Sequence, residues 1–318
     1  MTFKVLISHK IAAPGAKYLR ELGYDVVQAL DWETAKREIV DADAVMAGSD
    51  PFTREVLESA KKLKVLARFG AGCDAVDVAA ATKLGIRVTN TPRAMVTSMA
   101  EQTLALILAC AKNVAWMDKQ VRLGNYKAAA SDETRFSVEL EGKTLGVLGF
   151  GGLGRAAAEK ASKGLGMQIL AYSRSLTDDQ VPAGMKRAAS DVELFEQSDF
   201  VALFLPLNES TRGFANKALF SRMRQGSYLL NLARGGVVNE PDLVEALING
   251  PLAGAGLDVM VDEPPKPDNP LLKLDNVVLL PHTGSFTRQA RDNMGRDAAR
   301  CINEVLSGKE PSWPVNYL

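Results

Sequence analysis

Short apolar segments with strand character alternate with helical patterns along the first part of the chain. The strand-like segments are residues 4–8, 25–29, 44–47, 65–69 and 87–89, and the helical segments between them are 16–22, 34–40, 54–63 and 78–84. This alternation indicates βαβ units, because parallel strands need crossover connections and right-handed helical crossovers cover both faces of the sheet. Continuously apolar strands such as residues 65–67 are expected in a sheet that is buried on both faces. The sequence therefore predicts an α/β fold with a parallel sheet.

A second α/β series begins at Lys143. Its predicted strands are residues 144–150, 168–173, 200–205, 227–232, 256–259 and 277–280, and a final helix is predicted at 289–306. Between the two series, Ser98-Met99-Ala100-Glu101 matches a capping box, in which the serine and glutamate side chains satisfy backbone groups at a helix start. We therefore predict a long apolar helix from Ser98 to about Arg122 as the connector, followed by a polar, patternless segment at 124–141.

Composition narrows the class of protein. At about 150 residues per domain, 318 residues suggest two domains. The 38 basic and 38 acidic side chains cancel, which disfavours nucleic acid or an anionic membrane as the main partner. The longest apolar stretch, residues 104–111, is shorter than the roughly 18 residues that cross a bilayer, and the first ten residues lack the apolar centre of a signal peptide. We therefore expect a cytoplasmic protein.

The three cysteines, Cys73, Cys110 and Cys301, form no C-x-x-C pair. Their odd number and wide spacing argue against a disulfide framework and against a zinc site. We expect reduced thiols and no bound metal.

The segment Gly149-Phe150-Gly151-Gly152-Leu153-Gly154 has the pattern G-x-G-x-x-G. A predicted strand enters it and a predicted helix at 156–164 leaves it, which is the context that a dinucleotide site requires. Glycines permit the tight turn and a close approach of the backbone, and the helix N-terminus offers free N–H groups and a positive dipole to a pyrophosphate. We therefore predict a cofactor site at Gly149, Gly151, Gly152, Leu153 and Gly154, with the N–H groups of Gly152 and Leu153 as the phosphate donors.

An acidic residue about 20 positions after such a turn holds the ribose hydroxyls of NAD. In this chain that position falls on Ser173, followed by Arg174 and Ser175. Serine does not repel a 2′-phosphate, and Arg174 can pair with one through charge-assisted hydrogen bonds. The sequence therefore favours NADP(H) as the cofactor, with NAD(H) as the alternative.

Three ionisable residues follow strand ends in the second series. Arg234 comes after Asn231-Leu232-Ala233, Glu263 after Asp258-Val259, and His282 after Leu279-Leu280-Pro281. Groups just beyond the carboxyl ends of parallel strands converge on the crevice in which a cofactor binds. We therefore expect these three side chains to meet.

Hydride reduction of a ketone builds negative charge on the carbonyl oxygen, so the site needs an acid that titrates near neutrality. We assign this role to His282, with Glu263 fixing the tautomer and stabilising the imidazolium. Arg234, with its planar and permanently charged fork, would hold an adjacent carboxylate and polarise the carbonyl. The chain has one other histidine, His9, which is the rival acid and a candidate lining residue.

These residues also carry a resemblance to the D-isomer-specific 2-hydroxyacid dehydrogenase family, which includes glyoxylate/hydroxypyruvate reductases and phosphoglycerate dehydrogenases. The resemblance spans nearly the whole chain. The motifs in order are Gly70-Ala71-Gly72-Cys73-Asp74, Asn90-Thr91-Pro92, Ala100-Glu101, the glycine turn at 149–154, Asn231-Leu232-Ala233-Arg234-Gly235-Gly236-Val237-Val238, Asp258-Val259 with Glu263-Pro264, and Pro281-His282-Thr283-Gly284.

The resemblance implies two doubly wound parallel-sheet domains. Residues 1–98 and 290–318 would form a flavodoxin-like substrate domain, and residues 99–289 a Rossmann dinucleotide-binding domain. Arg234, Glu263 and His282 would be the catalytic triad, and the N–H groups of Ala71 and Gly72 would bind the substrate carboxylate together with Arg234 and His282. Further cofactor contacts would come from Pro206, Thr211, Ala233, Asp258 and Gly284, with Asp258 against the nicotinamide carboxamide.

The resemblance predicts an NAD(P)-dependent oxidoreductase that reduces a small 2-oxo acid to the D-2-hydroxy acid, or catalyses the reverse reaction, as a homodimer. Gly152 stands where many members have an arginine, which leaves backbone contacts to the phosphates. The chain ends at Leu318, so we expect neither an appended regulatory domain nor feedback control by serine.

Several alternatives stay open. One is a dinucleotide-sensing binding protein of the corepressor type, and another is a phosphite or formate dehydrogenase of the same superfamily. Formate enzymes pair the histidine with glutamine where Glu263 stands, so formate is disfavoured more than phosphite. The candidate substrates are glyoxylate, hydroxypyruvate, bulkier 2-oxo acids and phosphorylated 2-oxo acids. The phosphorylated acids are included because Arg68, Arg93 or Arg288 could bind a second anionic group.

Overall fold

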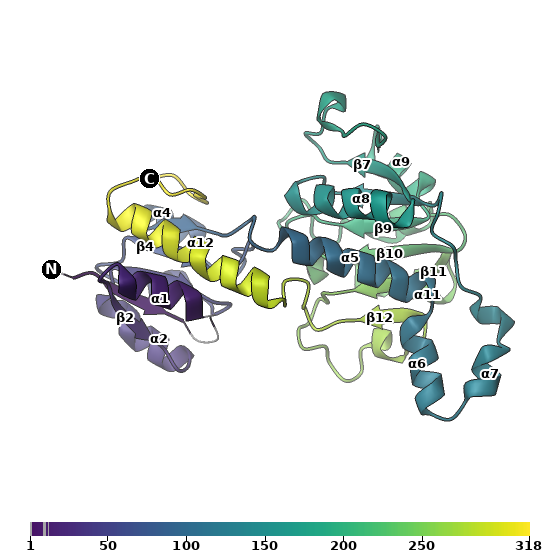
Figure 1. The fold of residues 1–318 in the computed structure, drawn as a ribbon, viewed down its shortest axis with the longest axis horizontal. Coiled ribbons are helices and arrows are strands. Elements are labelled where there is room, and N and C mark those ends of the chain that lie inside the picture. The colour runs from purple at the N-terminus through teal and green to yellow at the C-terminus, as the bar shows by residue number, and fades with distance from the viewer. Residues whose placement is uncertain (1, 9–10, 12) are drawn as a thin grey trace. The chain divides into compact units, whose positions relative to one another are not determined.

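The structure is a computed structural model that describes residues 2–8, 11 and 13–318. Contacts divide the chain into two compact units, Met1–Val96 with Ser285–Leu318, and Thr97–Gly284 (Figure 1). The sequence prediction drew these boundaries at 98 and 290. The first unit is thus built from two separate stretches of the chain, and the second from one.

The first unit is built on a parallel sheet, as predicted. In the described part of the chain this sheet has five strands in the order β2-β1-β3-β4-β5. That is the flavodoxin-like order of a doubly wound fold. The strands are β1 (Lys4–Ile7), β2 (Asp25–Gln28), β3 (Ala44–Ala47), β4 (Val65–Arg68) and β5 (Arg87–Thr89). The helices are α1 (Ala13–Glu21), α2 (Trp32–Glu38), α3 (Arg54–Ser59), α4 (Val78–Lys83) and α12 (Arg288–Leu306).

The last helix, α12, returns to the first unit and packs on α1 and on strands β3 and β4 (Figure 1). The two helices approach so closely that a Cβ atom on Gly15 would lie 2.4 Å from the carbonyl oxygen of Gly295. On the other side, Phe52, Leu57 and Leu66 are fully buried in the core of this unit. The final segment of the chain therefore completes the layer that begins with α1.

The second unit contains the other parallel sheet. Within the residues described, its seven strands follow the order β12-β11-β10-β9-β6-β7-β8. The order reverses between β6 and β9, as in a Rossmann fold. The strands are β6 (Thr144–Leu148), β7 (Gln168–Tyr172), β8 (Lys186–Arg187), β9 (Phe200–Leu203), β10 (Ser227–Asn231), β11 (Leu252–Leu257) and β12 (Val277–Leu279). The predicted fold class, two parallel-sheet α/β domains, is confirmed.

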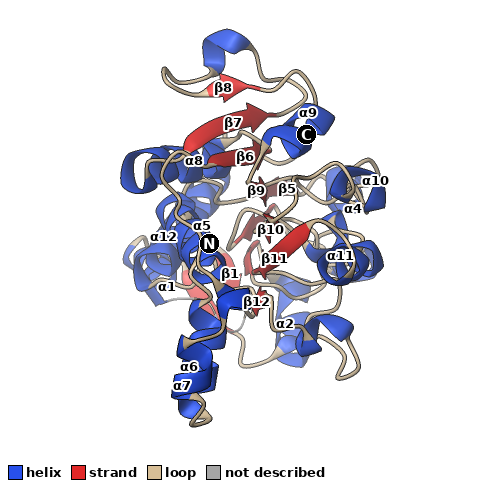
Figure 2. Cartoon of the chain, turned by 90° about the vertical axis from the view of Figure 1, so that its right-hand side faces the viewer, coloured by secondary structure: helices blue, strands red, loops and turns tan. Residues whose placement is uncertain are grey.

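Helices lie on both faces of this second sheet (Figure 2). The helices described in this unit are α5 (Val96–Ala111), α6 (Val114–Arg122), α7 (Tyr126–Ala130), α8 (Gly152–Leu165), α9 (Asp191–Gln197), α10 (Lys217–Phe220) and α11 (Glu240–Ile248). Helices α5 and α8 lie on one face, whereas α9, α10 and α11 lie on the other (Figure 2). Phe195 and Leu229 are fully buried between the sheet and the second group. Searching the described residues for a helix that could cross a membrane gives none.

The predicted connector helix differs in two ways from the observed one. The capping box at Ser98 is wrong, because α5 already begins at Val96 and the Ser98 hydroxyl donates to the carbonyl oxygen of Gly284. Glu101 pairs with Lys160 instead. The helix also breaks at Asn113, which adopts a left-handed φ of 51° and donates from its side-chain amide to the carbonyl oxygen of Arg135. Asparagine tolerates that conformation better than other non-glycine residues, and α6 starts directly after it.

Two strands of the second sheet were missed or misplaced. β8 was not predicted, since its two residues, Lys186 and Arg187, are polar. β11 begins and ends earlier than the predicted strand at 256–259, because Gly254 and Gly256 weaken the strand pattern. The polar segment predicted at 124–141 contains the short helix α7.

The glycine turn after β6 predicts a difference between two glycine substitutions. A Cβ on Gly154 would lie 2.3 Å from the carbonyl oxygen of Gly149, whereas a Cβ on Gly152 meets nothing within 4 Å. We expect Gly154→Ala to lower the free energy of unfolding by about 1–3 kcal/mol through overpacking. Gly152→Ala, the matched control, should leave it unchanged or raise it by up to about 1 kcal/mol. Urea denaturation checks both, and equal effects would contradict this account of the turn.

Candidate active site

The three predicted catalytic residues follow neighbouring strands of the second sheet. In the parallel ladders, Asn231 of β10 pairs with Leu257 of β11, and Leu257 pairs with Leu279 of β12. The three strands thus end at the same edge. The loops that leave this edge carry Arg234, Glu263 and His282, so side chains far apart in the sequence start from adjacent positions.

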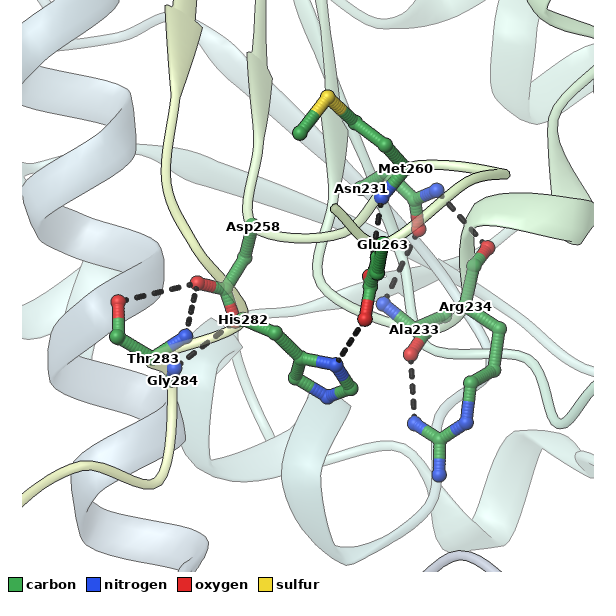
Figure 3. A network of polar contacts seen from close by, with 9 residues as sticks. All are labelled: Asn231, Ala233, Arg234, Asp258, Met260, Glu263, His282, Thr283 and Gly284. Atoms are coloured by element: carbon green, nitrogen blue, oxygen red, sulfur yellow. Dashed lines mark hydrogen bonds and ion pairs between the residues drawn. The ribbon is translucent and has the colours of Figure 1, made fainter. Parts of the chain in front are cut away.

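Glu263 and His282 are in direct contact, as predicted (Figure 3). The Nδ1 atom of His282 lies 2.8 Å from Oε2 of Glu263. The side chains are 46% and 38% exposed, so this pair is neither sealed in the core nor fully solvated. A carboxylate on Nδ1 favours the tautomer that carries a proton there, which leaves Nε2 as the atom that can exchange a proton with a ligand.

Several groups act on the Glu263 carboxyl at once. Burial by itself raises the pKa of Glu263, but the hydrogen bond and charge of His282 act in the opposite direction. The N–H of Met260, which donates to Oε1 at 3.1 Å, and the charge of Arg234 add to this effect. The net result is a pKa below the usual value, so Glu263 is ionised near neutral pH.

Arg234 lies beside this pair (Figure 3). It is half-buried, and its guanidinium donates from Nη1 to the carbonyl oxygen of Ala233 at 2.8 Å. Gly235, which follows it, has no room for a side chain, because a Cβ there would lie 1.9 Å from the carbonyl oxygen of Met260. The arginine loop and the glutamate loop are therefore packed directly against each other.

Asp258 organises the loop that carries His282. This aspartate is 1% exposed, and its two carboxylate oxygens accept the N–H groups of Thr283 at 2.8 Å and Gly284 at 2.9 Å. Its backbone carbonyl accepts the N–H of His282 at 2.8 Å. His282 has a left-handed φ of 54°, an unfavourable conformation that these bonds hold in place.

Sequence reasoning missed the part that Asn231 plays. This buried residue ends β10, accepts the N–H of Ala233 and donates to the carbonyl oxygen of Arg234 at 3.0 Å. It thereby shapes the turn on which Arg234 stands. A polar residue inside the apolar run Leu229-Leu230-Asn231-Leu232 was the available signal, since a buried amide must find hydrogen-bond partners.

The glycine turn fits a dinucleotide phosphate. Gly149 has a φ of 98°, and a Cβ there would lie 2.8 Å from the backbone of Phe204. Gly151 and Gly152 are exposed and have open space where a side chain would stand. Gly151 is the N-cap of α8, a helix of 14 residues. The turn therefore exposes the N-terminus of this helix and leaves room for a pyrophosphate against the backbone.

Ser173, Arg174 and Ser175 form the turn after β7, and the arginine side chain is exposed. Arg155 connects the glycine turn to the segment that follows. Its guanidinium lies 4.7 Å from the ring centre of Phe150 and donates to the carbonyl oxygen of Gln180 at 2.8 Å. Strands β6 and β7 pair in parallel with Leu148 beside Tyr172, so the two predicted cofactor segments leave neighbouring strands at the carboxyl edge of the sheet.

The remaining predicted positions fall in two places. Thr211 donates to the carbonyl oxygen of Pro206 at 2.6 Å, in the loop after β9. Ala71 and Gly72 follow β4 in the other unit, where the Asn90 side chain donates to the carbonyl oxygen of Ala71 at 2.8 Å.

His9 lies outside the described residues. Among those described, no group of three or more His, Cys, Asp or Glu residues is placed to hold a metal ion.

Comparison with known proteins agrees with this geometry. Residues 104–284 match the family described as D-isomer specific 2-hydroxyacid dehydrogenase, NAD binding domain. A glyoxylate reductase from Korarchaeum cryptofilum is 39% identical over 87% of this chain and 84% of that protein. D-3-phosphoglycerate dehydrogenase 2 from Arabidopsis thaliana is 38% identical over 98% of this chain, which spans only 50% of that protein.

A solved structure gives the same result. The NADPH-dependent glyoxylate/hydroxypyruvate reductase from Sinorhizobium meliloti, in complex with NADP and malonate, superposes with a TM-score of 0.86 at 28% identity. The alignment covers 99% of this chain and 97% of that one. The chain therefore belongs to the D-isomer-specific 2-hydroxyacid dehydrogenase family.

Proposed function

We propose that this protein is an NADP(H)-linked reductase that converts a small 2-oxo acid to the D-2-hydroxy acid, with His282 as the general acid. The observation that carries the proposal is the 2.8 Å contact between Nδ1 of His282 and the Glu263 carboxylate. This contact lies at the carboxyl edge of the sheet whose glycine turn fits a dinucleotide. In the direction of oxidation, the same histidine acts as the base.

The proton and the hydride go to opposite ends of one carbonyl group. When bound, the nicotinamide supplies the hydride to the carbonyl carbon. His282 donates a proton from Nε2 to the carbonyl oxygen, and Glu263 stabilises the imidazolium before this transfer. The surrounding half-buried environment strengthens this charge interaction relative to water.

Arg234 would bind the substrate carboxylate and polarise the carbonyl oxygen, since its guanidinium is planar, doubly donating and always charged. The N–H groups of Ala71 and Gly72 would hold the same carboxylate from the substrate domain. The hydrogen bond from the Asn90 side chain to the Ala71 carbonyl oxygen supports this assignment, because it restrains the loop that carries those N–H groups.

The cofactor would be held by the glycine turn at 149–154, the loop with Pro206 and Thr211, and the loops with Ala233, Asp258 and Gly284. Ser173, Arg174 and Ser175 support a preference for NADP(H) over NAD(H), because an exposed arginine and two hydroxyls offer a 2′-phosphate partners and no repulsion. The related S. meliloti enzyme is NADPH-dependent. The substrate is proposed only as a class, the small 2-oxo acids, and a panel of these measured with NADPH and NADH tests it.

We also propose a homodimer. Five large apolar side chains are exposed on and beside α6 and α7, which project from the second unit (Figure 1). They are Val114, Val121, Leu123, Tyr126 and Phe136. Exposed apolar side chains gathered on one segment are typical of an association surface.

A cytoplasmic location is proposed from the thiols. Cys110 and Cys301 are buried and carry free thiols. Burial raises the pKa of Cys110 to about 12, so this thiol stays protonated and unreactive. Free thiols are typical of a reducing compartment.

Replacing the proposed acid tests the core of the mechanism. We expect His282→Ala to lower kcat by about 10²–10⁴-fold, the usual contribution of general acid catalysis, while the Kd for NADPH stays within about twofold. Steady-state rate assays measure kcat, and NADPH fluorescence titration measures the Kd. His9→Ala, the matched variant at the other histidine, should keep its turnover. Normal turnover in His282→Ala would defeat the assignment, and tight NADPH binding without activity in the wild type would favour a sensing role.

The charge of Glu263 is tested by its amide. Reduction needs the imidazolium, and Glu263→Gln removes the negative charge that lies 2.8 Å from Nδ1 of His282. We expect Glu263→Gln to lower kcat for reduction by about 10–100-fold, with the Kd for NADPH within about twofold of the wild type. Glu196→Gln, which changes an exposed carboxylate paired with Arg222, is the control and should keep its turnover. Unchanged turnover in Glu263→Gln would separate this residue from the proton transfer.

The cofactor preference depends on Arg174. We expect Arg174→Ala to raise the KM for NADPH by about tenfold, the loss of one charge-assisted hydrogen bond, and to leave the KM for NADH within about twofold. Arg222→Ala removes another exposed arginine of the same unit and should change neither value. A wild-type preference for NADH would overturn the role given to the turn at Ser173.

A further inference from the structure

Ser98 makes a hydrogen bond that its position in the helix does not require. It lies in the first turn of α5 and is only 7% exposed. A serine or threonine inside a helix commonly donates to the carbonyl four residues earlier, as Thr103 does to Met99 at 2.8 Å. Ser98 donates instead to the carbonyl oxygen of Gly284, 2.7 Å away and 186 residues later in the chain.

Two further contacts restrain Gly284 besides its hydrogen bond with Ser98. Its N–H donates to Oδ2 of Asp258 at 2.9 Å. A Cβ on Gly284 would lie 2.4 Å from the sulfur of Met99, which follows Ser98 in α5. The peptide of Gly284 is therefore fixed between the first turn of α5 and the Asp258 carboxylate, and it cannot shift without disturbing both.

The same carboxylate connects Gly284 to the proposed acid. Oδ1 of Asp258 accepts the N–H of Thr283, and the Asp258 carbonyl accepts the N–H of His282 (Figure 3). Three consecutive peptides are thus fixed to one residue. His282 needs this support, because its φ of 54° is disfavoured for a residue with a side chain.

We propose that Ser98 is a positioning residue for the reaction, acting on His282 through Gly284 and Asp258. The inference rests on the proposed function, since it concerns the orientation of the proposed acid. Without the Ser98 hydroxyl, the Gly284 carbonyl loses its buried donor, and the peptides at 282–284 gain freedom. The imidazole then spends less time at the angle that Glu263 and a bound ketone require, and small misplacements of a catalytic group cost up to about 10²-fold in rate.

A matched pair of substitutions in α5 tests the inference. Ser98→Ala and Thr103→Val each remove one buried hydroxyl, but only Ser98 contacts Gly284. We expect Ser98→Ala to lower kcat by about 10–100-fold with an unchanged Kd for NADPH. Thr103→Val should stay within about twofold of the wild type. Ser98→Thr, which keeps the hydroxyl, should recover most of the rate.

The outcomes separate a positioning role from a structural one. If Ser98→Ala and Thr103→Val lose the same small amount of activity, or if Ser98→Thr is no better than Ser98→Ala, the inference is wrong. Amide hydrogen exchange gives a readout that needs no turnover: Thr283 and Gly284 should exchange at least about tenfold faster in Ser98→Ala and at the wild-type rate in Thr103→Val. Unchanged exchange would also overturn it. A wild type that reduces no 2-oxo acid would refute the proposed function and with it the catalytic role of Ser98, whereas the exchange data would still decide whether Ser98 fixes the loop.

Discussion

Hydrogen bonds between the parallel strands β10, β11 and β12 bring Asn231, Leu257 and Leu279 side by side at one edge of the sheet. Because all three strands run in the same direction, the loops that leave them share this edge, and the catalytic side chains need to reach only across neighbouring loops. Strands β10 and β11 are buried along almost their whole length, and the close packing of their side chains against the helices on the two faces holds them in this register. The chemistry of the site therefore depends on the ladder beneath it more than on any single contact between functional side chains.

Each charged group at this edge lowers the free-energy cost of charging its neighbour. Burial opposes ionisation of Glu263, but His282, the N–H of Met260 and the charge of Arg234 together more than offset it. The carboxylate in turn stabilises positive charge on the imidazole. Since the folded pKa of Glu263 is lowered, its ionised form stabilises the fold above its unfolded pKa, and this contribution is lost as pH falls through the folded pKa. Glu263 is thus ionised at neutral pH and keeps its charge beside the imidazole.

The sequence was sufficient where a pattern reports a local requirement of the backbone. Buried parallel strands must be apolar, and a phosphate turn must have glycine at Gly149 and Gly154, so both sheets and the turn could be predicted. The capping box at Ser98 failed because a hydroxyl at a helix start can serve a distant carbonyl as well as a local N–H. The break at Asn113 and the two-residue strand β8 leave little trace in composition. The hydrogen bonds of Asp258 with Thr283 and Gly284 join segments that only the fold brings together. The spacing of these residues along the sequence therefore does not predict them.

Buried polar side chains shape three loops of the candidate site. Asn231 holds the turn of Arg234, Asp258 holds the turn of His282, and Thr211 holds the turn at Pro206. Each satisfies backbone groups that would otherwise be unpaired at the end of a strand, where the ladder no longer provides partners. The backbone path of a loop is therefore set by residues other than those proposed to do chemistry. A change of reacting side chain can leave that path intact, whereas the loss of a buried organiser such as Asp258 releases the whole turn that carries His282.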